Sequence, residues 1–106
     1  MRRSLLLPLL ALLASACAGG GDYGDPCTTN ANCLAPLVCP RAGVYRGYCT
    51  TECGGSGSTE LCQSRHGEQA FCHIDHICVD ECSSSRDCSA GMFCDTSGIP
   101  DHCETR

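Results

Sequence analysis

Thirteen cysteines in a chain of 106 residues constrain the fold more than any other feature of this sequence. Cys17 follows an apolar leader, and the other twelve form three groups of four. An even set of cysteines at regular spacing in a short exported chain is typical of a disulfide framework. The groups are Cys27, Cys33, Cys39 and Cys49; Cys53, Cys62, Cys72 and Cys78; and Cys82, Cys88, Cys94 and Cys103. We therefore expect six disulfides and a chain that unfolds on reduction.

Residues 1–16 have the pattern of a secretory signal peptide. Two arginines precede an apolar run from Leu5 to Leu13, and small residues follow. The run is shorter than the roughly 20 residues that a membrane-spanning helix needs. The small residues before Cys17 resemble a bacterial lipobox, with Ala14 where leucine is usual. We expect lipidation of Cys17. The alternative is that Ala14-Ser15-Ala16 is an A-x-A site for ordinary signal peptidase, and that no lipid is attached.

The resemblance to bacterial lipoproteins also implies a location. Their usual signal for retention at the inner membrane is an aspartate after the lipidated cysteine, and this chain has Ala18 there. We therefore expect the outer membrane or cell surface, with secretion as the alternative. The Gly-rich residues 17–26 predict a flexible tether between anchor and folded part.

The composition beyond the leader excludes several functions. Five arginines and twelve acids follow Cys17, without a lysine, so the formal charge is −7. This balance disfavours nucleic-acid binding and attraction to anionic lipid, which both need clustered basic residues. Only eleven Leu, Ile, Val and Phe residues remain, too few for a large core. Disulfides are the expected source of stability, at roughly 2–4 kcal/mol each.

The cysteine groups form an internal repeat. Residues 27–39 and 82–94 share the spacing C-x5-C-x5-C, with Asn32 or Asp87 just before the second cysteine. The middle group is spaced more loosely and contains a Gly/Ser loop at 54–58. We predict three tandem modules, at 27–49, 53–78 and 82–103.

Each module is expected to fold in the same way. An opening turn leads to a short strand that ends at the third cysteine, and a Gly-containing turn leads back to the fourth. The predicted fold class is a small disulfide-rich protein of short β-hairpins and loops, with little helix and a minimal hydrophobic core. The preferred pairing joins the first cysteine to the third and the second to the fourth, although the sequence leaves three pairings open in each module.

The cysteine skeleton from residue 27 to residue 103 resembles known extracellular modules. The C-x5-C-x5-C core, with Asp or Asn before its second cysteine, looks like the Dickkopf N-terminal cysteine-rich type. It also resembles the related EGF-like and granulin-like modules of bacterial lipoproteins. The chain lacks the adjacent Cys-Cys pair and the C-x-x-C of Dickkopf domains, as well as the C-x-C of EGF domains. The resemblance implies an extracellular interaction module and carries no ligand with it.

No metal or cofactor is expected. Residues 72–78 contain two cysteines, His73, Asp75 and His76, all able to bind zinc, but oxidation of both cysteines would remove their thiolates. His73 and His76 are then exposed loop residues. The acids that could bind calcium form no EF-hand loop and are expected on a solvated surface; they are Asp75, Asp80, Glu81, Asp87, Asp95 and Asp101.

We also expect no enzyme. The sequence has no G-x-S-x-G elbow, H-E-x-x-H helix, phosphate loop or C-x-x-C redox pair. The best functional hypothesis is a lipid-anchored module that binds another extracytoplasmic protein. Alternatives are a structural envelope protein and a secreted inhibitor or toxin-like effector.

The loop at residues 41–48 is the best candidate for the binding surface. Tyrosine and arginine are enriched among the residues that dominate binding energy at interfaces. The candidates are Arg41, Tyr45, Arg46 and Tyr48. The competing interpretation is that the two tyrosines cover a small core.

Overall fold

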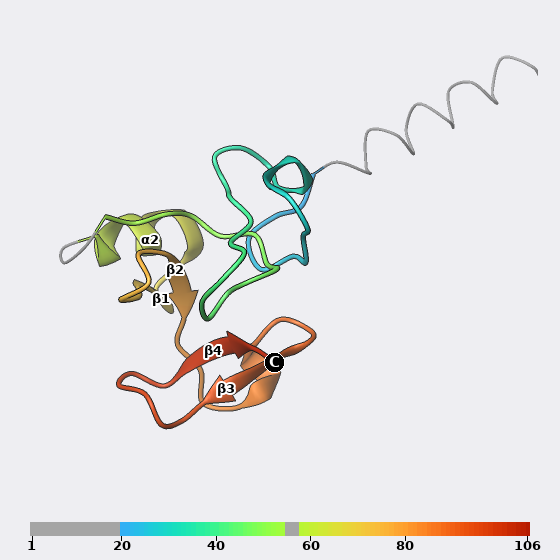
Figure 1. Cartoon of the computed structure of the whole chain (residues 1–106). Coiled ribbons are helices and arrows are strands. Elements are labelled where there is room, and N and C mark those ends of the chain that lie inside the picture. The colour runs from blue at the N-terminus through green and yellow to red at the C-terminus, as the bar shows by residue number, and fades with distance from the viewer. Residues whose placement is uncertain (1–19, 55–57) are drawn as a thin grey trace, which may run out of the picture.

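The computed structural model describes residues 20–54 and 58–106, so the predicted signal peptide and Cys17 lie outside the described residues. Within these two ranges the chain has one α-helix and two small antiparallel sheets, joined by long loops (Figure 1). In chain order the elements are η1 (Asn30–Asn32), α2 (Thr59–His66), β1 (Ala70–Cys72), β2 (Cys78–Asp80), η2 (Ser85–Asp87), β3 (Met92–Asp95) and β4 (His102–Thr105). The small disulfide-rich fold class predicted from the sequence is confirmed.

Six disulfides staple this fold, and each lies within one predicted module. The first cysteine of a module pairs with the third and the second with the fourth, which is the pairing preferred from the sequence. The bonds are Cys27–Cys39, Cys33–Cys49, Cys53–Cys72, Cys62–Cys78, Cys82–Cys94 and Cys88–Cys103.

The repeated residue before the second cysteine closes the opening turn. In the first module, the Asn32 side-chain oxygen accepts hydrogen bonds from the backbone N–H groups of residues 28 and 29. In the third module, the Asp87 carboxylate does the same with residues 83 and 84. Short Asn and Asp side chains favour such local bonds to the backbone. The sequence match between these positions therefore reflects one shared turn.

Each module then returns along a hairpin. In the second and third modules the hairpins are β1–β2 and β3–β4, and their registers place the third cysteine opposite the fourth. In the first module the hairpin shrinks to a single bridge between Val38 and Thr50. Because the third and fourth cysteines share the hairpin, their disulfides tie it to the loop or helix that precedes it.

Helix α2 begins directly after the Gly/Ser run at 54–58, in a module for which the sequence predicted a turn and a hairpin. Its first turn contains Glu60 and its last turn Arg65, charges that suit the helix dipole. Gly67 ends it at a φ of 110°, which residues with a Cβ rarely adopt. The sequence did not predict this short helix, because it directly follows the Gly/Ser run, which is typical of a loop.

The flexible tether predicted over residues 17–26 is wrong for residues 21–26. Gly21 donates to the Asn32 carbonyl and accepts from the Leu34 N–H, both at 2.7 Å, and Gly24 donates to the Cys49 carbonyl. A Cβ on Gly21 would lie 2.6 Å from the Asn32 oxygen. Glycine therefore serves close backbone approach here, and the segment is part of the folded first module.

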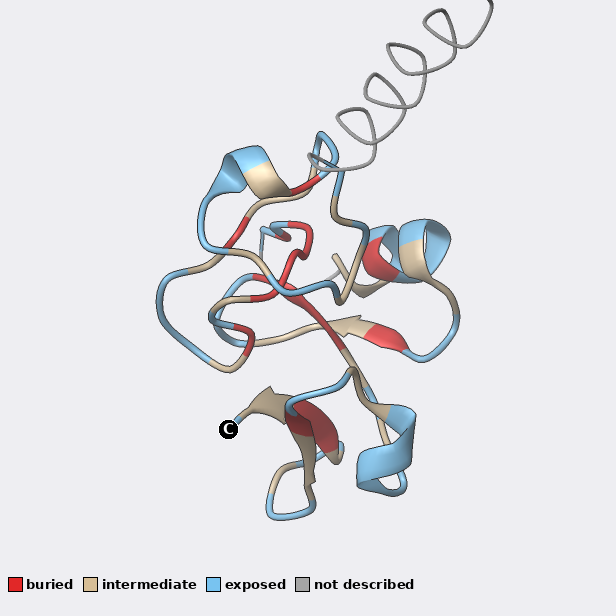
Figure 2. Cartoon of the chain, turned by 90° about the vertical axis from the view of Figure 1, so that its right-hand side faces the viewer, coloured by how far each residue is buried: buried red, intermediate tan, exposed pale blue. Residues whose placement is uncertain are grey.

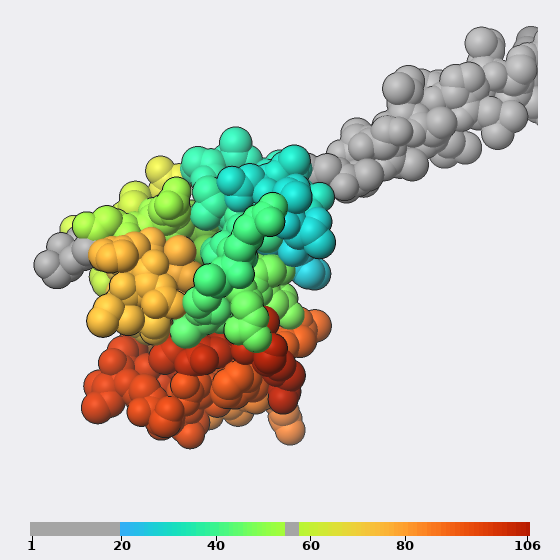
Figure 3. All heavy atoms as spheres, viewed as in Figure 1, coloured from blue at the N-terminus to red at the C-terminus, as the bar shows by residue number. Residues whose placement is uncertain are grey.

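One apolar cluster joins the three modules. Figure 2 shows buried segments running through the middle of the molecule. Figure 3 shows the last module packed directly against the other two. The buried members are Tyr45, Tyr48, Ile77, Val79, Met92 and Cys103. The three modules are therefore one packed unit in the described residues.

Candidate functional site

The structure corrects the predicted binding surface. Tyr45 is 2% exposed and Tyr48 9% exposed, so neither side chain is available to a partner. The Tyr45 hydroxyl oxygen accepts a bond from the Asp80 N–H, and the Tyr48 hydroxyl donates to the Ala90 carbonyl. The tyrosines of a loop with Gly and Arg looked like interface residues, but they fill the junction between modules, as the competing interpretation held.

The two arginines of the same loop remain on the surface. Arg41 and Arg46 are exposed and line one shallow groove of about 390 Å³. Arg46 also donates to the backbone carbonyl of Arg106, 3.0 Å away. Of the four predicted binding residues, the structure therefore brings the two arginines together on the surface and buries the two tyrosines.

A half-buried polar network connects the first two modules. Tyr23 donates to the Asp80 carboxylate at 2.7 Å, and its ring stacks on that of His66 with 3.7 Å between centroids. Burial raises the pKa of Tyr23 above its ordinary value and also raises the pKa of Asp80. Burial raises the pKa of Tyr45 to about 12. Tyr23 and Tyr45 therefore stay neutral hydroxyls beside Asp80, and the network serves to hold the two modules together.

The histidine-rich turn between β1 and β2 lacks free thiolates, because Cys72 and Cys78 are both disulfide-bonded. His76 is exposed as expected. His73 is not, since its side chain is only 14% exposed. Its ring packs between Phe71 and His102, with 4.8 Å between the two imidazole centroids. Burial lowers the pKa of His73.

A groove of about 470 Å³ runs between the turns of the two hairpins; we call it the turn groove. Ile74 and Ile99 flank it, 86% and 101% exposed. Phe71, His73, Pro100 and His102 also line it. Nothing in the sequence indicates this surface, because Ile99 follows Gly98 in the third module as Val44 follows Gly43 in the first. Val44 packs partly buried against the core, whereas Ile99 has no such neighbour.

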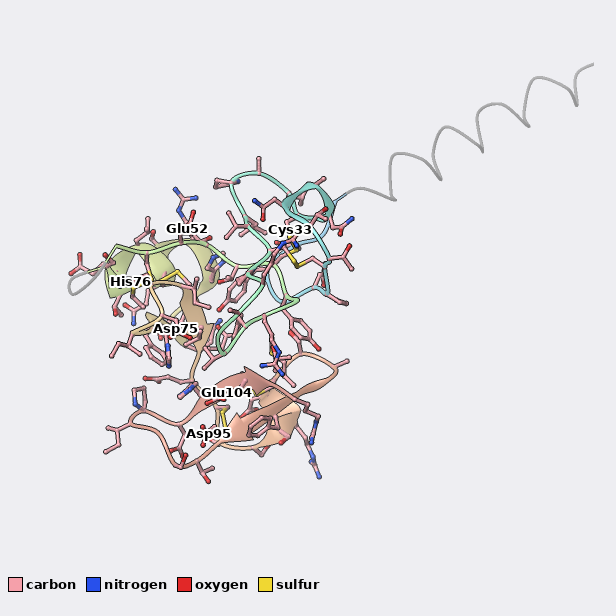
Figure 4. The ribbon with its side chains drawn as sticks, viewed as in Figure 1. Cys33, Glu52, Asp75, His76, Asp95 and Glu104 are labelled. Carbon is pink, nitrogen blue, oxygen red and sulfur yellow. A yellow bond between two sulfur atoms is a disulfide. The ribbon has the colours of Figure 1, made fainter. Side chains whose placement is uncertain are left out.

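A second feature lies beside this groove, on the β3–β4 hairpin. One imidazole nitrogen or carboxylate oxygen from each of Asp95, His102 and Glu104 lies within 4.8 Å of the others. Figure 4 labels Asp95 and Glu104 close together on this hairpin. Hydrogen bonding between the two carboxyl groups lowers the pKa of Asp95 to about 2 and raises the pKa of Glu104. We call these three residues the hairpin cluster.

Comparisons with protein-family models, with characterised proteins and with solved structures find no match to this chain. The resemblance to Dickkopf and EGF-like modules stays a prediction. Among the described residues, none of the helices has both the length and the apolar character needed to cross a membrane. The turn groove and the hairpin cluster are the two surfaces from which a function can be argued.

Proposed function

We propose that this chain is an exported, lipid-anchored module that binds another extracytoplasmic protein through the turn groove. Two features support export: the signal-peptide pattern of residues 1–16, and a fold stapled by six disulfides, which persist in oxidising compartments. Lipidation of Cys17 would hold the module at the outer membrane or cell surface.

The exposure of Ile74 and Ile99 is the observation that carries the binding proposal. A chain with so few large aliphatic residues leaves two of them in water on adjacent turns, although its core is small. Exposed apolar residues that border a groove are typical of interaction sites. The partner we propose is an extended segment of an exported protein that inserts an aliphatic or aromatic side chain between the two isoleucines.

Replacing both isoleucines by serine should abolish capture of this partner. Covering one isoleucine contributes about 1.5–3 kcal/mol, and 1.4 kcal/mol is a tenfold change in affinity. We expect the Ile74→Ser, Ile99→Ser double variant to retain less than about a tenth of the wild-type yield. The measurement is cross-linking of the full chain in intact envelopes, quantified by mass spectrometry.

Leu34→Ser is the matched control, because Leu34 is 51% exposed and lies away from the turn groove, in the first module. Its capture yield should equal that of the wild type. Circular dichroism should show the same fold in all three proteins. Equal capture by the double variant and the wild type would refute the proposed surface.

The anchor makes a separate prediction. The protein extracted from membranes should begin at Cys17 and carry a mass increase of the size of a lipid, because the lipobox-like residues place this cysteine at the cleavage point. The measurement is intact mass, with Cys17→Ser as the control that should lose the increase. A chain without added lipid would overturn the anchor and favour the secreted inhibitor alternative.

A further inference from the structure

The register of the β3–β4 hairpin places the three residues of the hairpin cluster on one face. Asp95 pairs directly with His102 across the two strands. Glu104 follows His102 by two positions, and alternate residues of a strand point to the same face. Residues that are nine positions apart in the sequence thus converge, although they look like scattered surface acids when the chain is read linearly.

The orientation of His102 is fixed by its surroundings. Its Nδ1 atom lies 3.0 Å from the Pro100 carbonyl oxygen, which can only accept a hydrogen bond. Nδ1 therefore carries the proton in the neutral ring, and the lone pair is on Nε2. The Phe71 ring packs against the imidazole edge to face, with 6.1 Å between centroids. A histidine that donates its other nitrogen to a backbone carbonyl is the usual arrangement of a metal ligand.

Nε2 of His102 points into the cluster without a hydrogen-bond partner among the described residues. The residue is 7% exposed, so water does not replace the missing partner freely. Glu104 Oε2 lies 2.9 Å away but outside the direction of a hydrogen bond. Leaving a buried polar atom unpaired costs about 1–3 kcal/mol. In the neutral ring, Nε2 is therefore a buried electron-pair donor that lies beside a carboxylate oxygen with no hydrogen bond between them.

Among the described residues, the one side chain that could bring positive charge to these carboxylates is His102 itself, and only when its ring is protonated. Within the described ranges, no arginine lies within 4.0 Å of an Asp95 or Glu104 oxygen. His73 does not serve either, because its Nδ1 accepts a bond from the Asp75 N–H and its nearest acid is Asp75. An external cation would satisfy both carboxylates and the Nε2 lone pair at once.

We propose that Asp95, His102 and Glu104 form a binding site for a divalent transition-metal ion of the zinc class. One imidazole nitrogen and two carboxylate oxygens are a known ligand set for Zn²⁺, at 2.0–2.2 Å from the ion. Such ligands lie about 3.3 Å apart around a tetrahedral ion, so the cluster closes around zinc with small side-chain shifts. Calcium and magnesium prefer oxygen ligands alone, and His102 disfavours them. This site does not depend on the proposed partner of the turn groove.

The test is a calorimetric titration of the disulfide-intact mature chain with zinc chloride after treatment with a chelator. We expect one Zn²⁺ per chain and much weaker binding of Ca²⁺ and Mg²⁺. Glu104→Gln and Asp95→Asn should each weaken zinc binding beyond the 10- to 100-fold that loss of an outer-shell partner costs, because each removes a direct ligand. Both variants keep the size of the side chain, so the hairpin should remain folded.

Two matched controls separate this site from nonspecific binding to surface groups. Glu52→Gln and His76→Gln change exposed residues that Figure 4 labels away from β3 and β4, and their zinc affinity should equal that of the wild type. In the wild type, the nitrogen-15 resonance of His102 Nε2 should shift on zinc addition while that of His76 stays. Absence of zinc binding, equal binding by all variants, or a shift at His76 instead of His102 would each overturn the proposal.

Discussion

Reduction of the six disulfides should unfold the described part of this protein completely. The pairs are separated by 12 to 19 residues along the chain, and loops of this length are worth about 3 kcal/mol each in the chain-entropy account. A small domain is stable by only about 5–15 kcal/mol in total. The sum over six bonds exceeds that margin even when it is discounted for non-additivity, and the thin apolar core cannot replace it.

The measurement is the proton NMR spectrum before and after reduction and alkylation. We expect the dispersed amide signals of the oxidised protein to collapse to those of an unfolded chain. A matched pair of double variants sharpens the test. Removal of Cys62–Cys78, both 0% exposed, should destabilise the protein more than removal of Cys27–Cys39 at the edge of the first module. A reduced chain that keeps its dispersed spectrum would show that the core suffices alone.

The elements set by local spacing could be predicted from the sequence. The hairpins return from the third cysteine to the fourth as expected, through a turn that contains glycine in the first and third modules. In the second module the expected glycine is absent, and His76 takes the left-handed position at a φ of 64°. The match of Asn32 with Asp87 predicts the same opening turn in the first and third modules, and each residue does close its turn. Such features depend on bonds within or next to a single module, so repetition in the sequence reveals them.

The contacts between modules could not be predicted. Tyr23 reaches Asp80 across 57 positions, and this long-range bond turns an apparent tether into folded structure. Tyr45 meets the Asp80 backbone across 35 positions, so its burial depends on how two modules dock. Composition tells only that tyrosine suits both an interface and a core. Which of the two applies is decided by distant partners.

The candidate sites show the same division. The sequence shows Asp95 as one of several acids and does not join it to His102 and Glu104, because their convergence depends on the β3–β4 register. The turn groove needs two hairpin turns from different modules to lie side by side. The sequence shows only the type of each residue and its neighbours along the chain. These two surfaces arise from pairing between strands and from packing between modules, which the sequence does not show.

Tyr45→Ala should destabilise the protein by about 3–5 kcal/mol, the usual cost of deleting a buried aromatic ring. The ring is 2% exposed and packs in the cluster that joins the three modules. Its loss would leave a cavity and also leave the half-buried Asp80 N–H without its acceptor, 3.0 Å away. This outcome is the opposite of the one that an exposed binding residue would give.

Guanidinium denaturation with the disulfides intact measures the effect, and two variants apportion it. Tyr45→Phe keeps the ring but removes the hydroxyl, so it should cost only about 1–3 kcal/mol, the penalty of one unpaired buried N–H. Arg41→Ala changes an exposed residue of the same loop and should stay within about 0.5 kcal/mol of the wild type. If Tyr45→Ala were as stable as Arg41→Ala, the ring would have to lie on the surface, and the loop at residues 41–48 would again be the best candidate for partner binding.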